Sequence, residues 1–192
     1  MLALGDRQGR LIAALLTLAS GEGGVEQWEP FDLAELTGNV VLARREDAER
    51  RGMEVSTALS AAAAKGDPRL AESLVVNLVD NAIRYNETGG RVEISTVSIA
   101  GRATLRVGNT GAVIPAGQVG RLFEPFQRLG GQRTKNGDGY GLGLAIVRAI
   151  ADAHGATVTP RARPEGGLDI EVSFPGHPGG ALPTAVAARA SQ

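Results

Sequence analysis

The sequence predicts an α+β fold, a two-layer α/β sandwich in which a mixed, mostly antiparallel sheet carries helices on one face and is preceded by a helical remnant. Three observations lead to this prediction. A segment that opens at Gly66-Asp67-Pro68 repeats apolar residues at helical spacing. Two runs of alternating apolar and polar residues, 91–99 and 102–107, indicate an antiparallel β-hairpin. A further apolar-periodic helix is expected over residues 144–153.

At the start of the chain, leucines recur at helical spacing within residues 11–19, and glycines between 21 and 24 end that helix. Residues 28–33 are expected to form a linker that finishes with Asp32 as the N-cap of a helix running to about Arg51. A domain boundary is therefore expected near residue 28.

Further along, residues 53–62 alternate as a strand would, and Ala100-Gly101 provides a tight connection for the hairpin. Strands are also expected near residues 157–163 and 168–174. Residues 176–192 consist largely of Pro, Gly and Ala without periodicity, so we expect a disordered tail there.

Composition narrows the classes of function. The 192 residues carry a formal charge of −1, which lacks the basic footprint of a general nucleic-acid binder. The absence of cysteine excludes disulfides and thiolate zinc sites, so a cytoplasmic location is expected. The strongly apolar stretch at 11–19 is too short to cross a bilayer, although the parent protein could be anchored in a bacterial inner membrane.

The string NLVDNAIRYN at residues 77–86 is the first chemical signal. Asn77, Asn81 and Arg84 fall at i, i+4 and i+7 and so share one stripe of a helix. A half-buried amide without a partner costs about 1–3 kcal/mol, which suggests that a polar ligand, such as a metal-bound nucleotide, docks there. The alternative is that these amides are simply solvated.

A second signal is the alternating glycine string at residues 137–143, which leads straight into a helix. Glycines let successive backbone N–H groups approach an anion, and a helix N-terminus adds a favourable dipole, so a polyphosphate would fit. A flexible loop is the alternative. No strand enters these glycines, and Leu144 rather than lysine follows them, which excludes the dinucleotide-binding and Walker A patterns.

Four motifs in one order now resemble the ATP-binding catalytic domain of bacterial sensor histidine kinases, a member of the gyrase-type ATPase superfamily with the Bergerat fold. NLVDNAIRYN is similar to the family's N box, GNTGAVIP at 108–115 to its first glycine box, LFEPF at 122–126 to its F box, and GYGLGLAIV at 139–147 to its second glycine box. The resemblance covers roughly residues 30–175. It implies that residues 28–175 are the catalytic kinase domain.

The resemblance also implies roles on the helix and the first glycine box. Asn81 would coordinate the Mg²⁺ that bridges the phosphates of ATP, with Asn77 supporting it one turn earlier. Arg84 would pair with phosphate oxygens, and Tyr85 would pack against adenine. Asn109 would accept a hydrogen bond from the exocyclic amine of adenine.

In the same way, Arg128 and Arg133 are candidates for contacting the terminal phosphate, and residues 129–140 would form a mobile lid. The backbone positions expected to hold the nucleotide are Gly111, Gly139, Gly141, Leu142, Gly143 and Leu144. Phosphoryl transfer needs positioning, a metal and cationic or N–H donors, and this set supplies the protein's share.

Two residues depart from the family pattern. The family usually has aspartate at Asn109 and a second glycine at Val113. An asparagine also carries a donor, so by rotating its amide it could serve the carbonyl of guanine; we therefore expect weakened discrimination against GTP. If position 113 needs positive φ, valine is costly there and ATP affinity falls; otherwise it covers the base with apolar surface.

The family's phosphate acceptor is a histidine on an upstream helical dimerisation domain, and neither His154 nor His177 lies in that context. His154 is interpreted as structural. Residues 6–22 resemble the end of that domain's second helix, so 1–27 are expected to be its remnant with a linker. The chain should then bind ATP, act on its own dimerisation domain and serve a response regulator, but not label itself, and it should be a monomer or weak dimer. An anti-sigma-factor-type serine kinase and a degenerate binding module remain alternatives.

Overall fold

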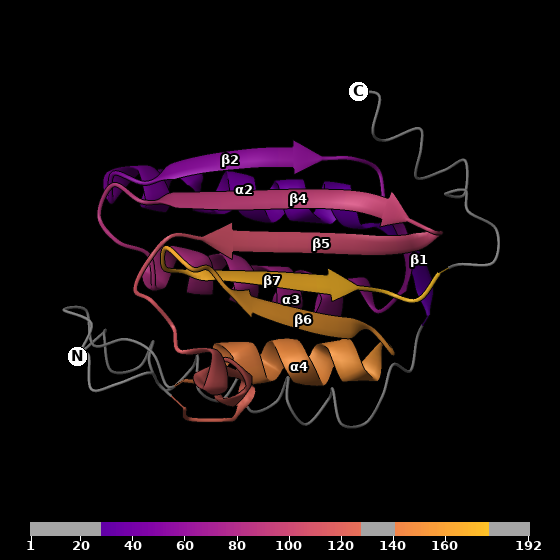
Figure 1. Ribbon diagram of the computed structural model, residues 1–192. Helices are drawn as coiled ribbons and strands as arrows, with labels where there is room; N and C mark the ends of the chain where they lie inside the picture. Colours follow the sequence, from indigo (N-terminus) through magenta and orange to yellow (C-terminus); the bar gives the residue numbers. More distant parts are fainter. Residues whose placement is uncertain (1–27, 128–140, 177–192) are drawn as a thin grey trace, which may run out of the picture.

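A computed structural model describes residues 28–127 and 141–176. Its main feature is a five-stranded sheet in the order β2-β4-β5-β7-β6, in which β2 and β4 are parallel and every other pair is antiparallel. Three helices cover one face of this sheet, and no helix of the described residues covers the other, which we call the open face (Figure 1). The α+β sandwich with helices on one face is therefore confirmed.

The helices begin where the sequence places its caps. Helix α2 (Leu33–Arg50) starts after Asp32, whose carboxylate accepts from the N–H of Ala34 at 2.9 Å. Helix α3 (Pro68–Arg84) starts after Asp67, which accepts from two backbone N–H groups of its first turn. Helix α4 (Gly143–Ala153) begins without any side-chain cap, a point that matters for the site below.

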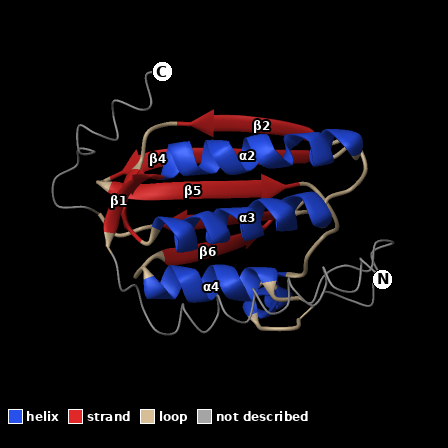
Figure 2. Ribbon diagram, turned by 180° about the vertical axis from the view of Figure 1, so that it is seen from behind, coloured by secondary structure: helices blue, strands red, loops and turns tan. Residues whose placement is uncertain are grey.

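Strand bounds follow the alternation of apolar residues. The central hairpin is β4 (Arg91–Ile99) with β5 (Arg102–Asn109). Its turn residues Ala100 and Gly101 have φ of 50° and 76°, as a tight two-residue hairpin turn requires. The second hairpin is β6 (Thr157–Ala162) with β7 (Leu168–Ser173), which pairs with β5. The three helices lie side by side over these strands in the reverse view (Figure 2).

The strand expected at 53–62 is confirmed as β2 (Glu54–Leu59), but two further strands in the first part of the chain were not expected. One is β3 (Ala63–Gly66), which follows β2. The expected linker contains β1 (Glu29–Asp32), which pairs antiparallel with β3. The physical reason is Asp32: besides capping α2, its carboxylate accepts from the buried N–H of Ala62 at 3.0 Å, which turns the chain out of the main sheet.

The core fills the space between the sheet and the helices. Its largest fully buried side chains come from both the helices and the sheet, and they include Leu33, Leu74, Leu78, Leu105, Ile150, Val172 and Phe174. Within the described residues, no helix combines the length and apolar character needed to cross a membrane.

Candidate nucleotide-binding site

Helix α3 presents the predicted polar stripe beside the second glycine box. Leu74, Leu78 and Ala82 are buried on its core side, whereas Asn77, Asn81 and Arg84 are half-buried. Tyr85 is exposed at the C-cap, so it does not join the core. The predicted separation of the helix into an apolar side and a polar stripe therefore holds from Leu74 to Arg84.

The amide of Asn77 links this stripe to α4. Its Nδ2 donates to the carbonyl of Ser73 one turn earlier at 2.8 Å, which directs Oδ1 away from that carbonyl. A Cβ atom placed on Gly143 would lie 3.4 Å from Asn77 Oδ1, so the first residue of α4 approaches the stripe closely. The polar stripe and the glycine-rich helix start thus form neighbouring walls of one site.

The start of α4 supplies backbone donors. Leu142 stands at the N-cap position, makes no side-chain cap hydrogen bond, and precedes Gly143 and Leu144. The first intrahelical bond of this end is from the N–H of Ile146 to the carbonyl of Leu142, at 2.9 Å. The N–H groups before it have no partner within the helix, and together with the helix dipole they favour an anion.

The third wall is the first glycine box at the end of β5. Asn109 is nearly buried and lies opposite Leu168 of β7 in the sheet register. Gly111 has φ of 152°, and a Cβ there would lie 2.6 Å from the carbonyl oxygen of Tyr85. Only glycine allows this close approach of the loop to the end of α3. The predicted residues Asn109 and Gly111 are therefore beside the predicted residue Tyr85.

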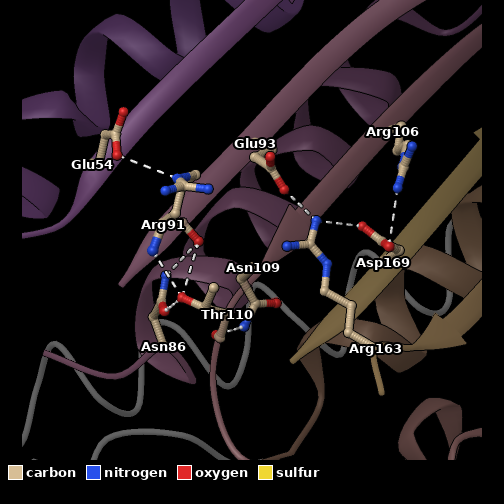
Figure 3. Close-up of polar contacts among 9 residues, drawn as sticks. All are labelled: Glu54, Asn86, Arg91, Glu93, Arg106, Asn109, Thr110, Arg163 and Asp169. Carbon is tan, nitrogen blue, oxygen red and sulfur yellow. Dashed lines mark hydrogen bonds and ion pairs between the residues drawn. The ribbon is translucent and has the colours of Figure 1, made fainter. Parts of the chain in front are cut away.

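The amide of Asn109 has a defined orientation. Its Nδ2 donates to the carbonyl oxygen of Thr110 at 2.5 Å, and its Oδ1 has no hydrogen-bond partner within the part of the chain that the structure describes. Figure 3 shows the oxygen turned away from Thr110. Nor does the side-chain amide of Asn81 make a hydrogen bond to any described residue. Both amide oxygens are thus left to accept from a ligand or to coordinate one.

Val113 is free of the backbone strain considered from the sequence. The described non-glycine residues with positive φ are Ala100 and Phe126, so Val113 has an ordinary backbone conformation. Its side chain is 68% exposed. The second of the two interpretations, added apolar surface at the site, is the one that this geometry favours.

The F box is tied to the second glycine box. The N–H of Phe126 donates to the carbonyl of Gly141 at 3.0 Å, and Gly141 has φ of 70° with its α-carbon packed against Phe126 and Gln127. Phe123 is buried, with the guanidinium of Arg148 5.4 Å above its ring. All four motifs therefore meet around one site.

The turn between β6 and β7 supports the first glycine box from behind. The N–H of Gly167 donates to the carbonyl of Ala112 at 3.0 Å, and a Cβ on Gly167 would overlap with the carbonyl oxygen of Asn109. The sequence analysis gave the paired glycines at 166 and 167 no role at the site. Their adjacency in a short turn was the only signal, because the contact joins segments far apart in the chain.

An ion network on the open face of the sheet holds the same region (Figure 3). Arg163 pairs with Asp169 at 2.8 Å and with Glu93, and Asp169 also pairs with Arg106 at 3.0 Å. Burial alone would raise the pKa of Asp169, but hydrogen bonds from Arg163 and Arg106 outweigh it, so its pKa lies below the ordinary value. The hydrogen bond to Asp169 likewise raises the pKa of Arg163. Sequence reasoning missed this network.

Some predicted residues lie outside the described part of the chain. They are Arg128, Arg133 and Gly139, together with the expected lid at 129–140, the helical remnant at 1–27 and nearly all of the tail at 176–192. The other predicted site residues lie in the described part of the chain, at the end of α3, in the first glycine box and at the start of α4, and their roles stay predictions. These residues are Asn77, Asn81, Arg84, Tyr85, Asn109, Gly111, Gly141, Leu142, Gly143 and Leu144.

The donor set suits a nucleotide better than an isolated metal. Among the described residues, no group of three or more His, Cys, Asp or Glu side chains could hold a metal ion. Mg²⁺ commonly keeps few protein ligands and takes the rest of its oxygens from phosphate and water. The half-buried amide oxygen of Asn81 fits that arrangement as a single protein ligand.

Comparison with known proteins gives concordant matches. Residues 66–178 match the family described as "Histidine kinase-, DNA gyrase B-, and HSP90-like ATPase". The sensor protein CutS of Streptomyces coelicolor is 42% identical over 176 residues, which make up 91% of this chain and 42% of CutS. The sensor histidine kinase CusS of Escherichia coli K12 is 30% identical over 154 residues, 79% of this chain and 32% of CusS. This chain therefore spans less than half the length of these relatives.

Solved structures agree with the fold. The mycobacterial sensor histidine kinase MprB has a TM-score of 0.67 and 28% identity over 78% of this chain and 98% of that chain. The full-length ShkA structure in complex with AMPPNP has a TM-score of 0.77 and 25% identity over 91% of this chain and 37% of that chain.

Proposed function

Because the chain belongs to the family of histidine kinase-, DNA gyrase B- and HSP90-like ATPases, we propose that it is the ATP-binding catalytic domain of a sensor histidine kinase. It would transfer the γ-phosphoryl group of ATP to a histidine on an upstream dimerisation domain, for relay to a response regulator. The observation that carries this proposal is the approach of Gly143, at the uncapped start of α4, to the amide stripe of α3.

Each wall of the site has a distinct share in binding. The N–H groups in the first turn of α4, which have no partner within that helix, donate to phosphate oxygens, and Arg84 adds positive charge. Asn109 Oδ1 accepts from the exocyclic amine of adenine, while exposed Tyr85 and Val113 offer apolar surface to the base. Bound Mg²⁺ neutralises charge on the phosphates, and Asn81 is the residue that would hold it.

The described histidine of this chain does not fit the role of acceptor. His154 is fully buried, its Nε2 accepts from the N–H of Asp67 at 3.1 Å, and its Nδ1 donates to the carbonyl of Ile150 at 2.8 Å. His177 lies outside the described residues, so the proposal of an external acceptor, as in a relay between domains, is supported by the burial of His154 and by the family to which the chain belongs. The names of the relatives, all of which are sensor proteins or sensor kinases, support this over the serine-kinase alternative.

Calorimetric titration with ATP tests the proposal. We expect binding that requires Mg²⁺ and weakens at least tenfold in Asn81→Ala, because a metal ligand is lost. Asn39→Ala is the matched control, since it makes the same change on the exposed surface of α2 and should bind as the wild type does. No heat from ATP at any Mg²⁺ concentration, with the folded wild-type chain, would refute the proposed function.

A further inference from the structure

The residue type of Asn109 does not by itself decide whether the site prefers adenine or guanine. An asparagine side chain offers an acceptor on one side and two donors on the other. The oxygen suits the amine at C6 of adenine, whereas the nitrogen suits the carbonyl at C6 of guanine. Which purine this site takes therefore depends on which end of the Asn109 amide faces outward.

The structure fixes that orientation through the neighbouring carbonyl. Asn109 Nδ2 donates to the carbonyl oxygen of Thr110 at 2.5 Å, within a nearly buried environment. Rotating the amide would bring Oδ1 against that carbonyl oxygen, replace a hydrogen bond with two facing acceptors and so disfavour the rotated form. A lost buried hydrogen bond corresponds to a population change of about tenfold or more.

The residue that carries this carbonyl, Thr110, is held through its hydroxyl and its N–H in a cluster with Asn86 and Arg91, which we call the Thr110 cluster (Figure 3). The hydroxyl of Thr110 accepts from the N–H of Arg91 at 2.8 Å and donates to Asn86 Oδ1 at 2.7 Å. The N–H of Thr110 donates to the carbonyl of Arg91 at 3.0 Å, and Asn86 Nδ2 donates to the same carbonyl at 3.0 Å.

The cluster is compact, and it joins two walls of the site. Asn86 follows directly on the C-cap of α3, Arg91 begins β4, and Thr110 follows the last residue of β5. A Cβ on Gly90 would overlap with both Asn86 Oδ1 and Thr110 Oγ1, so glycine is required for the cluster to close. The threonine carbonyl consequently has one position relative to the end of the amide-bearing helix.

We propose that Thr110 and Asn86 are positioning residues that set base selectivity: they fix the Asn109 amide with its oxygen outward and so select adenine over guanine. This inference rests on the proposed nucleotide site, and it revises the weakened discrimination expected from asparagine alone. Neither residue needs to touch the base. Each acts through the carbonyl that receives the Asn109 N–H.

The test is the ratio of GTP to ATP dissociation constants, measured by calorimetry with Mg²⁺ on the 192-residue chain. We expect the wild type to prefer ATP at least as strongly as Asn109→Asp does, because both present an acceptor to the base and only the amide does so without setting a second oxygen against the Thr110 carbonyl. Thr110→Val keeps the branched shape but removes the hydroxyl, and it should lower the preference about tenfold. Thr110→Ser retains the hydroxyl and should keep the ATP preference of the wild type.

A double variant separates positioning from simple loss of structure. A carboxylate has no donor to turn outward, so in Asn109→Asp with Thr110→Val the ATP preference should stay at its Asn109→Asp value. A purely structural effect would weaken both nucleotides equally and leave the ratio unchanged. If Thr110→Val fails to fold, Asn86→Ala removes another hydrogen-bond partner of the Thr110 cluster and should shift the ratio of dissociation constants in the same direction.

The outcomes are distinguishable. An unchanged ratio in Thr110→Val and Asn86→Ala, with ATP still bound, overturns the positioning role and leaves the nucleotide site intact. A wild type that binds GTP as well as ATP overturns it too. A folded wild type that binds neither nucleotide overturns the proposed function along with this inference.

Discussion

The ion network behind the first glycine box gives a prediction with a worked magnitude, through the substitution Asp169→Asn. Asp169 and Arg163 have side chains only 17% and 14% exposed, and their pair is 2.8 Å long. A hydrogen bond between charged groups contributes about 1.5–3 kcal/mol. The second partner, Arg106, is 55% exposed, so its share is close to that of a surface pair, about 0–1 kcal/mol.

Part of this contribution survives the substitution, because Arg163 keeps Glu93 and the new amide can still accept. We therefore expect Asp169→Asn to lower the free energy of unfolding by about 1–2 kcal/mol at pH 7, which corresponds to roughly 3–6 °C in Tm for a chain of this size. Urea unfolding followed by circular dichroism measures it. The matched control is Glu54→Gln, which removes an exposed ion pair with Arg91 and should cost under about 0.5 kcal/mol.

The pH dependence has a definite sign. The folded state lowers the pKa of Asp169, so its contribution is complete above the unfolded pKa, about 3.9, and is lost as the pH falls through the folded value. The stability difference between wild type and Asp169→Asn should therefore shrink between pH 5 and pH 3. A difference that stays constant across this range, or one no larger than that of Glu54→Gln at pH 7, would refute the reasoning.

Three further substitutions have defined outcomes. Thr37→Val should stabilise the fold by about 1 kcal/mol in urea unfolding, because the buried Thr37 hydroxyl has no hydrogen-bond partner among the described residues; a loss of stability would contradict this. Gly167→Ala and Gly89→Ala both place a side chain at positive φ, but only at Gly167 would it overlap with Asn109, so only that variant should also weaken ATP binding in calorimetry. His154→Phe should cost about 1–3 kcal/mol in thermal unfolding, since the partly buried N–H of Asp67 loses its acceptor; an unchanged Tm would exclude that role.

Helix starts and turns that are determined by residues close together in the sequence could be predicted. Asp32 and Asp67 cap their helices because a short carboxylate at that position reaches the first-turn N–H groups whatever the rest of the fold does. Ala100-Gly101 forms the hairpin turn because two alternating runs flank it at the right spacing. In each case the residues that determine the geometry are within a few positions of one another.

The pairing of β1 with β3 could not be predicted, because its cause is not local. Pro30 offers no N–H for a ladder, and neither strand is long enough to show alternation. What brings them together is the Asp32 carboxylate, which receives the N–H of Ala62 from across the fold. A carboxylate read as a helix cap gave no indication of that second bond.

The candidate site shows the same division. The motifs predicted which segments lie together, and three contacts join them: Gly143 approaches Asn77, Gly111 approaches Tyr85, and Phe126 donates to Gly141, while the ligand roles of the residues stay predictions. They could not predict the orientation of the Asn109 amide, which depends on the carbonyl of Thr110 and thus on a hydrogen-bonded cluster that spans three elements. Residue type gave two possibilities for the base, and only the contact geometry distinguishes them.

The spacing of the nucleotide-binding walls is determined at their far ends. His154 caps the C-terminus of α4, and its ring accepts from the N–H of Asp67 at the start of α3. A Cβ on Gly66 would overlap with that ring, so the two helices are joined there as closely as backbone permits. The opposite ends of the same helices carry Gly143 and the amide stripe. This contact between the helices lies outside the site. The distance between the N–H groups of α4 and the amides of α3 therefore does not depend on the contacts that Asn109 makes. A substitution at a residue that contacts the base can then change the preference for adenine or guanine without moving the residues that bind phosphate.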